Sequence, residues 1–416
     1  MHGRLSLVVA SVAITLAALV SVGAAWRAGH APPPKVEPAP APPAAPEPAP
    51  AAVAEAEEPT NPLLDPQATL LPDELLARRL TDEEKAAMAA ELDRLKTRHA
   101  AELVSVISSA AHDEPSPIPP SFLLSIAFAE TRGKVLAVSP AGAAGLAQAT
   151  PAAYLMEGLA GPLFLTDQYL IGTRAYIMKK PLGDAVAIAG RVIDGRATRA
   201  EALDLVAKAK ELRRVGVDEL EVLAPRAPEV FLPRVEAADR YNEEILEELD
   251  GLLSRGASRA ALTTFRDRVQ KEYRALLRVQ QANWERYAAA LERERDRVLR
   301  RHFGGDPAKV LLLRPYEAGE VLGEHLDARF SPTQMAAFLR AHALTKRRQA
   351  IDLGVPDDEI EAWTAALYNG GLVNVTRIRA GLIPPVRETE TYMRKVPEMR
   401  ERLEGVAPAA TVDGAQ

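Results

Sequence analysis

The sequence predicts a mainly α-helical protein. Ala, Leu, Glu and Arg dominate the second half of its 416 residues, and only 5% of the residues are aromatic, a mixture that favours helices over sheets. Apolar side chains recur with a spacing near 3.6 residues, and Pro and Gly separate the periodic stretches. A hydrophobic fraction of 47% is enough for the cores of two or three domains.

The N-terminal segment predicts export. Leu5 to Trp26 is an uncharged, largely apolar run of 22 residues between Arg4 and Arg27. Its length suits a bilayer span of about 20 residues, while Val22-Gly23-Ala24 is also typical of a cleavage site. We expect residues 1–30 to be a signal peptide or N-terminal membrane anchor. The remainder is expected in the cell envelope or periplasm, either anchored in the inner membrane by residues 5–26 or secreted after signal cleavage.

A linker is predicted over residues 31–62, which consist almost wholly of Pro, Ala and Glu. Such a segment cannot bury apolar surface, and its prolines favour extended polyproline II. At about 3 Å per residue, a disordered linker of this length would hold the following domain roughly 90 Å from a membrane.

Residues 63–180 have a helical pattern. Thr81-Asp82-Glu83-Glu84 is typical of a helix start. Ser121 is a candidate N-cap for a short apolar helix, Phe122 to Ala129, that ends at Glu130. A helical face that follows the first start signal is predicted to contain Leu92, Leu95, His99, Leu103 and Ile107.

Residues 181–356 are rich in Arg and Glu and strongly periodic, which predicts a coiled-coil-like hairpin or arm. Gly304 to Pro307 should end its long helix, and Tyr241 to Leu253 is the predicted shorter partner. Breaker residues at Pro181 to Gly183 and at Gly354 to Pro356 mark the expected junctions. We expect this segment to bury its own apolar stripe, which is formed by Leu262, Phe265, Val269, Tyr273, Leu276, Trp284, Tyr287, Leu291 and Val298.

Charge and composition exclude several function classes. The net charge of −6 gives no reason to expect a nucleic-acid partner. The absence of cysteine excludes disulfides and thiolate metal sites, and the seven histidines form no ligand pair of the HExxH type. We therefore do not expect a metalloenzyme.

Glu130 is the candidate catalytic residue. It ends an apolar helix in the segment SFLLSIAFAETRG, and Ile126 to Ala129 directly before it predict a poorly hydrated setting. Desolvation disfavours the carboxylate anion and raises its pKa, as a general acid near neutrality requires.

Three further segments carry polar residues at regular positions. SPAGAAGLAQATP, residues 139–151, is a glycine-punctuated turn that contains Gln148. ALYNGG, residues 366–371, ends a helix with Tyr368 and Asn369; Asp357 is the expected cap at the start of that helix. PPVRETETYMRKV, residues 384–396, places Tyr392 four residues after Glu388, on one helical face.

Together and in this order, the four segments resemble the catalytic domain of the soluble lytic transglycosylase family, whose fold is related to goose-type lysozyme. The family's Glu-Ser pair is matched by Glu130-Thr131, its SPxGAxGLMQ segment at residues 139–148, its AYNxG segment at Tyr368-Asn369, and its ETxxYVxKV segment at residues 388–396. The resemblance covers roughly residues 95–180 and 357–400. It implies a lysozyme-like core split by a long helical insertion.

This resemblance implies an organisation along the chain. The expected parts are an N-terminal signal or anchor (1–30), a linker (31–62), the first half of the transglycosylase domain (63–180), the helical insertion (181–356), the second half of the domain (357–400) and a disordered tail (401–416).

The resemblance also implies an activity, which is cleavage of the MurNAc–GlcNAc β-1,4 bond of peptidoglycan glycan strands with formation of 1,6-anhydro-muramyl ends. Glu130 would be the single acid and base, and the implied reaction needs no cofactor or metal. The residues expected to orient the acid or line the sugar groove are Thr131, Gln148, Tyr368, Asn369 and Tyr392. The chain departs from the family pattern at Thr131, Ala147, Leu372, Val373 and Glu390, which puts substrate preference and groove shape in doubt.

Two alternatives remain open. A lysozyme-like muramidase would need a second acid to position water, and Glu361, Glu388 and Glu390 are the candidates. A non-catalytic envelope scaffold would bind peptidoglycan without cutting it. In the transglycosylase interpretation, the insertion is expected to gate the groove or to dock another envelope protein.

Overall fold

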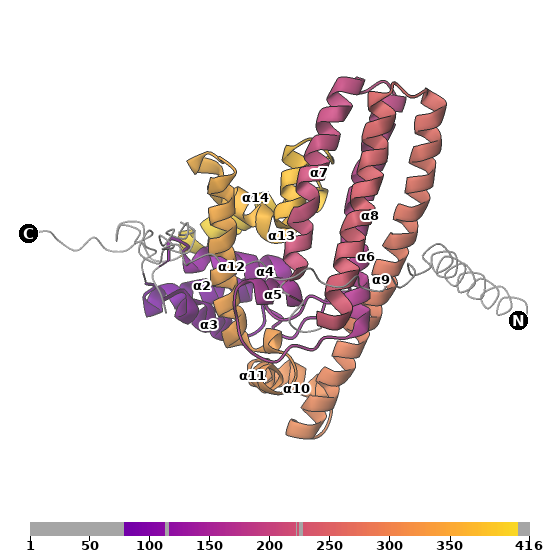
Figure 1. Ribbon diagram of the computed structural model, residues 1–416. Helices are drawn as coiled ribbons and strands as arrows, with labels where there is room; N and C mark the ends of the chain where they lie inside the picture. Colours follow the sequence, from indigo (N-terminus) through magenta and orange to yellow (C-terminus); the bar gives the residue numbers. More distant parts are fainter. Residues whose placement is uncertain (1–78, 113–115, 222, 224–227, 407–416) are drawn as a thin grey trace, which may run out of the picture. The chain divides into compact units, whose positions relative to one another are not determined.

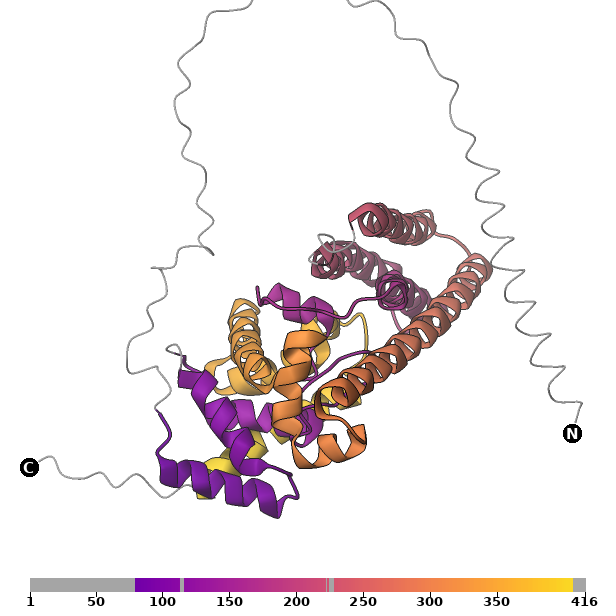
Figure 2. The ribbon, with the colours of Figure 1, turned by 90° about the horizontal axis from the view of Figure 1, so that it is seen from below.

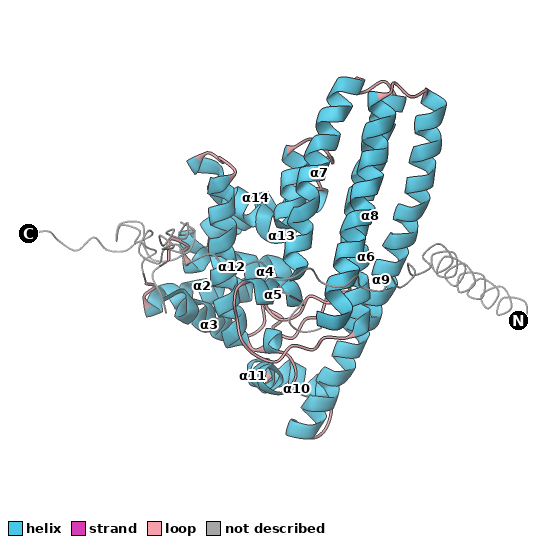
Figure 3. Ribbon diagram, in the orientation of Figure 1, coloured by secondary structure: helices cyan, strands magenta, loops and turns pink. Residues whose placement is uncertain are grey.

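The computed structural model describes residues 79–112, 116–221, 223 and 228–406. Within these residues the protein is mainly α-helical, as predicted, and its only β structure is two isolated bridges (Figure 3). The expected signal or anchor and the linker, residues 1–62, lie outside the described residues. Among the described helices none is long and apolar enough to cross a membrane.

The predicted helix start at Thr81 is confirmed, but the face expected to follow it is divided between two helices. The Thr81 hydroxyl and the Glu84 carboxylate form a reciprocal capping box for α2 (Asp82–Arg94). The chain then turns through Lys96 and His99, which have φ angles of 64° and 55°. The face continues in α3 (Ala100–His112), so a single helix over this stretch is wrong.

Helix α4 (Pro120–Thr131) carries Glu130 in its last turn. Pro119 is its N-cap, so the prediction for Ser121 is wrong: Ser121 lies inside the helix and donates a 2.6 Å hydrogen bond to Glu404 of α14 (Arg387–Val406). Arg132 ends the helix in the left-handed conformation. Because most of its residues are buried, α4 lies in the centre of the largest apolar core.

Four long helices lie side by side: α6 (Asp167–Ile193), α7 (Arg199–Glu221), α8 (Pro228–Ser254) and α9 (Arg259–Phe303) (Figure 1). The predicted stop at Gly304 is confirmed, because Gly304 caps α9. A helix over Tyr241 to Leu253 is confirmed within the longer α8, but the main partner of α9 is α6 and not α8. Their facing sides form a separate apolar core that includes Ile188, Val206, Leu246, Leu249, Phe265 and Val269.

The expected break at Pro181 to Gly183 is wrong, because α6 passes through these residues without interruption. Proline removes one backbone hydrogen bond from a helix, but Leu182 and Ala185 are fully buried in the four-helix core directly after it. That burial outweighs the local preference of proline. The expected boundary at residues 180 and 181 therefore falls inside a helix.

The region 181–356 does not bury its apolar surface independently. Its later part contains the second half of α9, then α10 (Pro307–Leu313), α11 (Pro315–His325), η4 (Ala328–Phe330) and α12 (Pro332–Asp352). Figures 1 and 2 show α9 extending past α6, α7 and α8 toward α10 and α11. Side chains of this later part pack in the same core as α4, among them Tyr287, Leu291, Leu322, Met335 and Phe338.

The C-terminal helices carry the last two segments. Asp357 does not cap the next helix; it begins a single 3-10 turn, η5 (Asp357–Glu359). Helix α13 (Ile360–Arg379) then runs past Tyr368 to a kink at Gly371, whose φ of 70° and ψ of 159° are not helical. Helix α14 continues to Val406, so the beginning of the expected tail at residue 401 is helical.

Candidate active site

A cavity of about 820 Å³ lies where α4, α13 and α14 meet; we call it the Glu130 cavity. Glu130, Arg132, Asn369, Glu388 and Tyr392 are among the residues that line it. The structure thus brings together Glu130, Asn369 and Tyr392, three of the residues singled out from the sequence.

Glu130 is half-buried in this cavity, and its pKa is raised from 4.5 to about 7. The main cause is burial, which disfavours the anion, and Glu388 adds electrostatic repulsion. Tyr392 acts in the opposite direction, because its hydroxyl donates a 2.8 Å hydrogen bond to Oε1 of Glu130. Near neutral pH this carboxyl group is therefore suited both to give and to accept a proton.

Hydrogen bonds connect the four sequence segments in a closed ring around Glu130. Helix α4 is bonded to the loop of residues 139–149, and this loop is bonded to α13. Helix α13 is bonded to α14, and α14 is bonded back to α4. The bonds run from Thr131 Oγ1 to Leu146 O (3.3 Å), from Tyr368 Oη to Ala147 O (3.0 Å), from Thr389 Oγ1 to Asn369 Oδ1 (3.5 Å) and from Tyr392 Oη to Glu130 Oε1 (2.8 Å).

Three of the expected site residues have roles in this framework rather than in the cavity lining. The Thr131 hydroxyl donates to main-chain carbonyls. Tyr368 donates to Ala147 O, and burial raises its pKa well above the ordinary value. The Gln148 side chain donates to the carbonyls of Ala137 and Gly145, and Gln148 does not line the Glu130 cavity. All three stabilise the loop that packs beside Glu130.

The second-acid candidates are separated by the structure. Glu361 forms an ion pair with Arg400 and lines a different cavity. Glu390 is exposed and does not line the Glu130 cavity, whereas Glu388 does. Of the three, only Glu388 shares a cavity with Glu130.

Basic side chains also line the Glu130 cavity, and none of them was among the expected site residues. They are Arg132, Arg387, Lys395 and Arg402. Arg402 forms an ion pair with Glu91, and the other three form no ion pair with any described residue. The cavity therefore presents these basic groups close to the half-buried acid, together with the carboxyl groups of Glu388 and Glu398.

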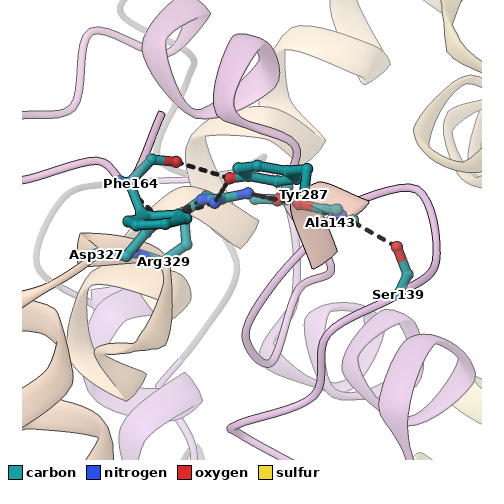
Figure 4. A network of polar contacts seen from close by, with 8 residues as sticks. Ser139, Ala143, Phe164, Tyr287, Asp327 and Arg329 are labelled. Carbon is teal, nitrogen blue, oxygen red and sulfur yellow. Dashed lines mark hydrogen bonds and ion pairs between the residues drawn. The ribbon is translucent and has the colours of Figure 1, made fainter. Parts of the chain in front are cut away.

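A buried arginine donates hydrogen bonds to the main chain of the loop of residues 139–149 (Figure 4). Arg329 is fully buried, and its Nη1 donates to the carbonyls of Gly142 (2.9 Å) and Ala149 (3.0 Å). Asp327, also fully buried, accepts from Nε (2.9 Å) and Nη2 (2.7 Å) of Arg329. Nη2 also donates to the Tyr287 hydroxyl (2.7 Å). We call Asp327 and Arg329 the arginine clasp.

The clasp explains why the loop requires glycine. A Cβ at Gly145 would lie 1.7 Å from the carbonyl oxygen of Arg329, and the φ of Gly145 is 77°. Tyr287 extends the network by donating to Phe164 O at 2.8 Å. Residues of the expected insertion thus build the support of the loop beside Glu130.

Comparisons with family models, curated proteins and solved structures found no match to this chain.

Proposed function

We propose that this protein is a peptidoglycan lytic transglycosylase whose lysozyme-like core carries Glu130 as its single acid and base. The observation that carries the proposal is the ring of hydrogen bonds that joins the four resembling segments around Glu130. An acid with a pKa of about 7 in a cavity of about 820 Å³ fits general acid–base catalysis on a polysaccharide.

In the proposed reaction, protonated Glu130 gives its proton to the glycosidic oxygen between MurNAc and GlcNAc, and the bond to the muramyl C1 breaks. The acetamido group of the substrate stabilises the developing cation. Glu130, now a carboxylate, takes the proton of the muramyl C6 hydroxyl, whose oxygen bonds to C1 and closes the 1,6-anhydro ring. The Tyr392 hydroxyl holds the carboxyl group and favours its anionic form after the first proton transfer.

The lining of the cavity supports an anionic substrate. Peptide stems of peptidoglycan carry carboxylates, and Arg132, Arg387 and Lys395, which form no ion pair with any described residue, present positive charge in the same cavity. Neutral glycans could accept hydrogen bonds from these groups but would form no ion pair with them.

A lysozyme-like muramidase is the second candidate, and the position of Glu388 in the Glu130 cavity favours it. In that mechanism Glu388 would activate a water molecule for attack on C1. Export to the cell envelope and docking of an envelope protein on the helical region remain part of the proposal.

Mass spectrometry of the products from purified peptidoglycan tests the proposal. We expect muropeptides with 1,6-anhydro-muramyl ends. Reducing muramyl ends would instead establish the muramidase, and binding without any cleavage would establish the non-catalytic scaffold.

The pH dependence of kcat/KM should follow Glu130. Because the protonated acid starts the reaction, kcat/KM is expected to fall about tenfold per pH unit above a pKa of about 7. Tyr392→Phe removes a hydrogen bond that lowers this pKa, so the falling limb should move to higher pH. Glu388→Gln removes a charge that raises it, so the limb should move to lower pH.

Glu390→Gln is the matched control, since Glu390 is an exposed carboxylate of the same helix outside the cavity. Its pH profile should coincide with that of the wild type. Identical falling limbs in all four proteins would mean that another group controls the acid step.

A further inference from the structure

A second cavity, of about 430 Å³, lies between α6, α9 and α13. We call it the cationic cavity. Lys179, Lys180 and Arg377 line it, together with the neutral polar side chains of Gln270 and Asn374. No carboxylate occurs among the described residues that line it.

The positive charge of the cationic cavity is only partly compensated. Arg377 donates from Nε to the buried carboxylate of Asp184 at 3.0 Å. Neither Lys179 nor Lys180 forms an ion pair within the described part of the chain. Burial lowers the pKa of Lys179 to about 8, and repulsion from Lys180 and Arg377 adds to the effect. Within the described residues the protein therefore holds two ammonium groups that form no ion pair, and burial disfavours the charge of Lys179.

The aromatic wall of the cavity positions both ammonium groups. Nζ of Lys180 lies 4.1 Å from the ring centre of Tyr176, and Nζ of Lys179 lies 5.4 Å from the same centre. The ring of Trp284 packs against the ring of Tyr176 at a centroid distance of 5.4 Å. Cation–π attraction offsets part of the repulsion between the lysines, but it supplies no negative charge.

We infer that the cationic cavity is a binding site for a phosphate ester of about the size of a sugar. Two lysines that form no ion pair with a described residue, next to an arginine already paired with Asp184, favour a group that carries more than one negative charge. The volume exceeds what a phosphate ion needs, and the neutral polar groups of Gln270, Asn374 and Tyr273 are available to the remainder of the ligand.

This site is separate from the proposed catalytic chemistry. Helix α13 contributes Asn369 to the Glu130 cavity and Asn374 to the cationic cavity, with the Gly371 kink between them. The inference therefore does not depend on what Glu130 does, and it is tested by binding alone.

Isothermal titration calorimetry of the full chain with glucose 6-phosphate, inorganic phosphate and glucose tests the inference at constant ionic strength. We expect glucose 6-phosphate to bind most tightly, inorganic phosphate more weakly, and glucose not at all. Lys179→Gln/Lys180→Gln should weaken binding of glucose 6-phosphate at least about tenfold, which corresponds to about 1.4 kcal/mol.

The matched control is Lys271→Gln/Lys309→Gln, which removes the same charge from two exposed positions outside the cavity. It should bind like the wild type. Equal affinity of both double variants would overturn the inference, because binding would then follow net charge alone. The inference would also be overturned if neither glucose 6-phosphate nor inorganic phosphate bound to the wild type. Binding of inorganic phosphate alone would exclude the sugar-sized ligand. Circular dichroism checks that both variants are folded.

Discussion

Glu130→Gln is expected to lower kcat for the release of muropeptides by at least about a hundredfold, because the amide cannot supply the proton to the glycosidic oxygen. The variant keeps the size of the side chain and an oxygen that can accept from Tyr392, so KM should change much less than kcat. Turnover of purified peptidoglycan, with products identified by mass spectrometry, measures both. Wild-type turnover by this variant would remove Glu130 from the mechanism.

The same variant should also change the free energy of unfolding, in a direction that follows from the raised pKa of Glu130. The folded-state pKa of Glu130, about 7, lies above the ordinary value of 4.5, so its ionisation opposes folding. Below pH 4.5 the wild type and Glu130→Gln should have similar free energies of unfolding. Between pH 4.5 and 7 the variant should become the more stable protein, and the difference should level off above pH 7. Thermal unfolding at several pH values measures this, and a variant less stable at pH 8 contradicts the assigned burial.

Arg329→Met is expected to destabilise the protein by about 3–5 kcal/mol, because it leaves the carboxylate of Asp327 buried without its charged partner. It also removes the donors to the carbonyls of Gly142 and Ala149, so the loop beside Glu130 loses its support. Chemical unfolding measures the loss of stability. Turnover at a temperature where the variant is still folded should also fall.

The matched control is the double variant Asp327→Asn/Arg329→Met, in which no uncompensated charge is buried. It should recover a substantial part of the stability but not the turnover, because the loop carbonyls still lack their donor. Full recovery of turnover would show that the arginine clasp stabilises the core without positioning the loop.

Local signals in the sequence predicted the helix ends at Thr81 and Gly304 correctly and the N-caps at Ser121 and Asp357 wrongly. The Thr81 capping box and the stop at Gly304 depend on the chemistry of neighbouring residues, which one chain segment contains completely. Pro181 is the opposite case. Its effect on α6 is decided by the burial of Leu182 and Ala185 against helices that lie far away in the sequence.

Some residues of the candidate site were predicted from the sequence, and others were not. Glu130 and Tyr392 were expected together, and the structure joins them by a hydrogen bond. Gln148 was expected in the groove, but its amide has closer partners in its own loop. Nothing in the sequence pointed to Arg329, because an Asp-Ala-Arg segment between two helices shows neither its burial nor the distant carbonyls that it binds.

The hydrogen bond between Tyr392 and Glu130 also bears on the order in which the protein folds. The two residues are 262 positions apart, and α14 leaves the ribosome after every other described helix. Contacts over such a separation form late, since the long intervening chain must first be brought together. The four long helices have their own core and can collapse earlier. We therefore expect a nascent chain that stops before Arg387 to hold Glu130 without its tyrosine and without one wall of its cavity, so that the completion of synthesis decides when the acid acquires its environment.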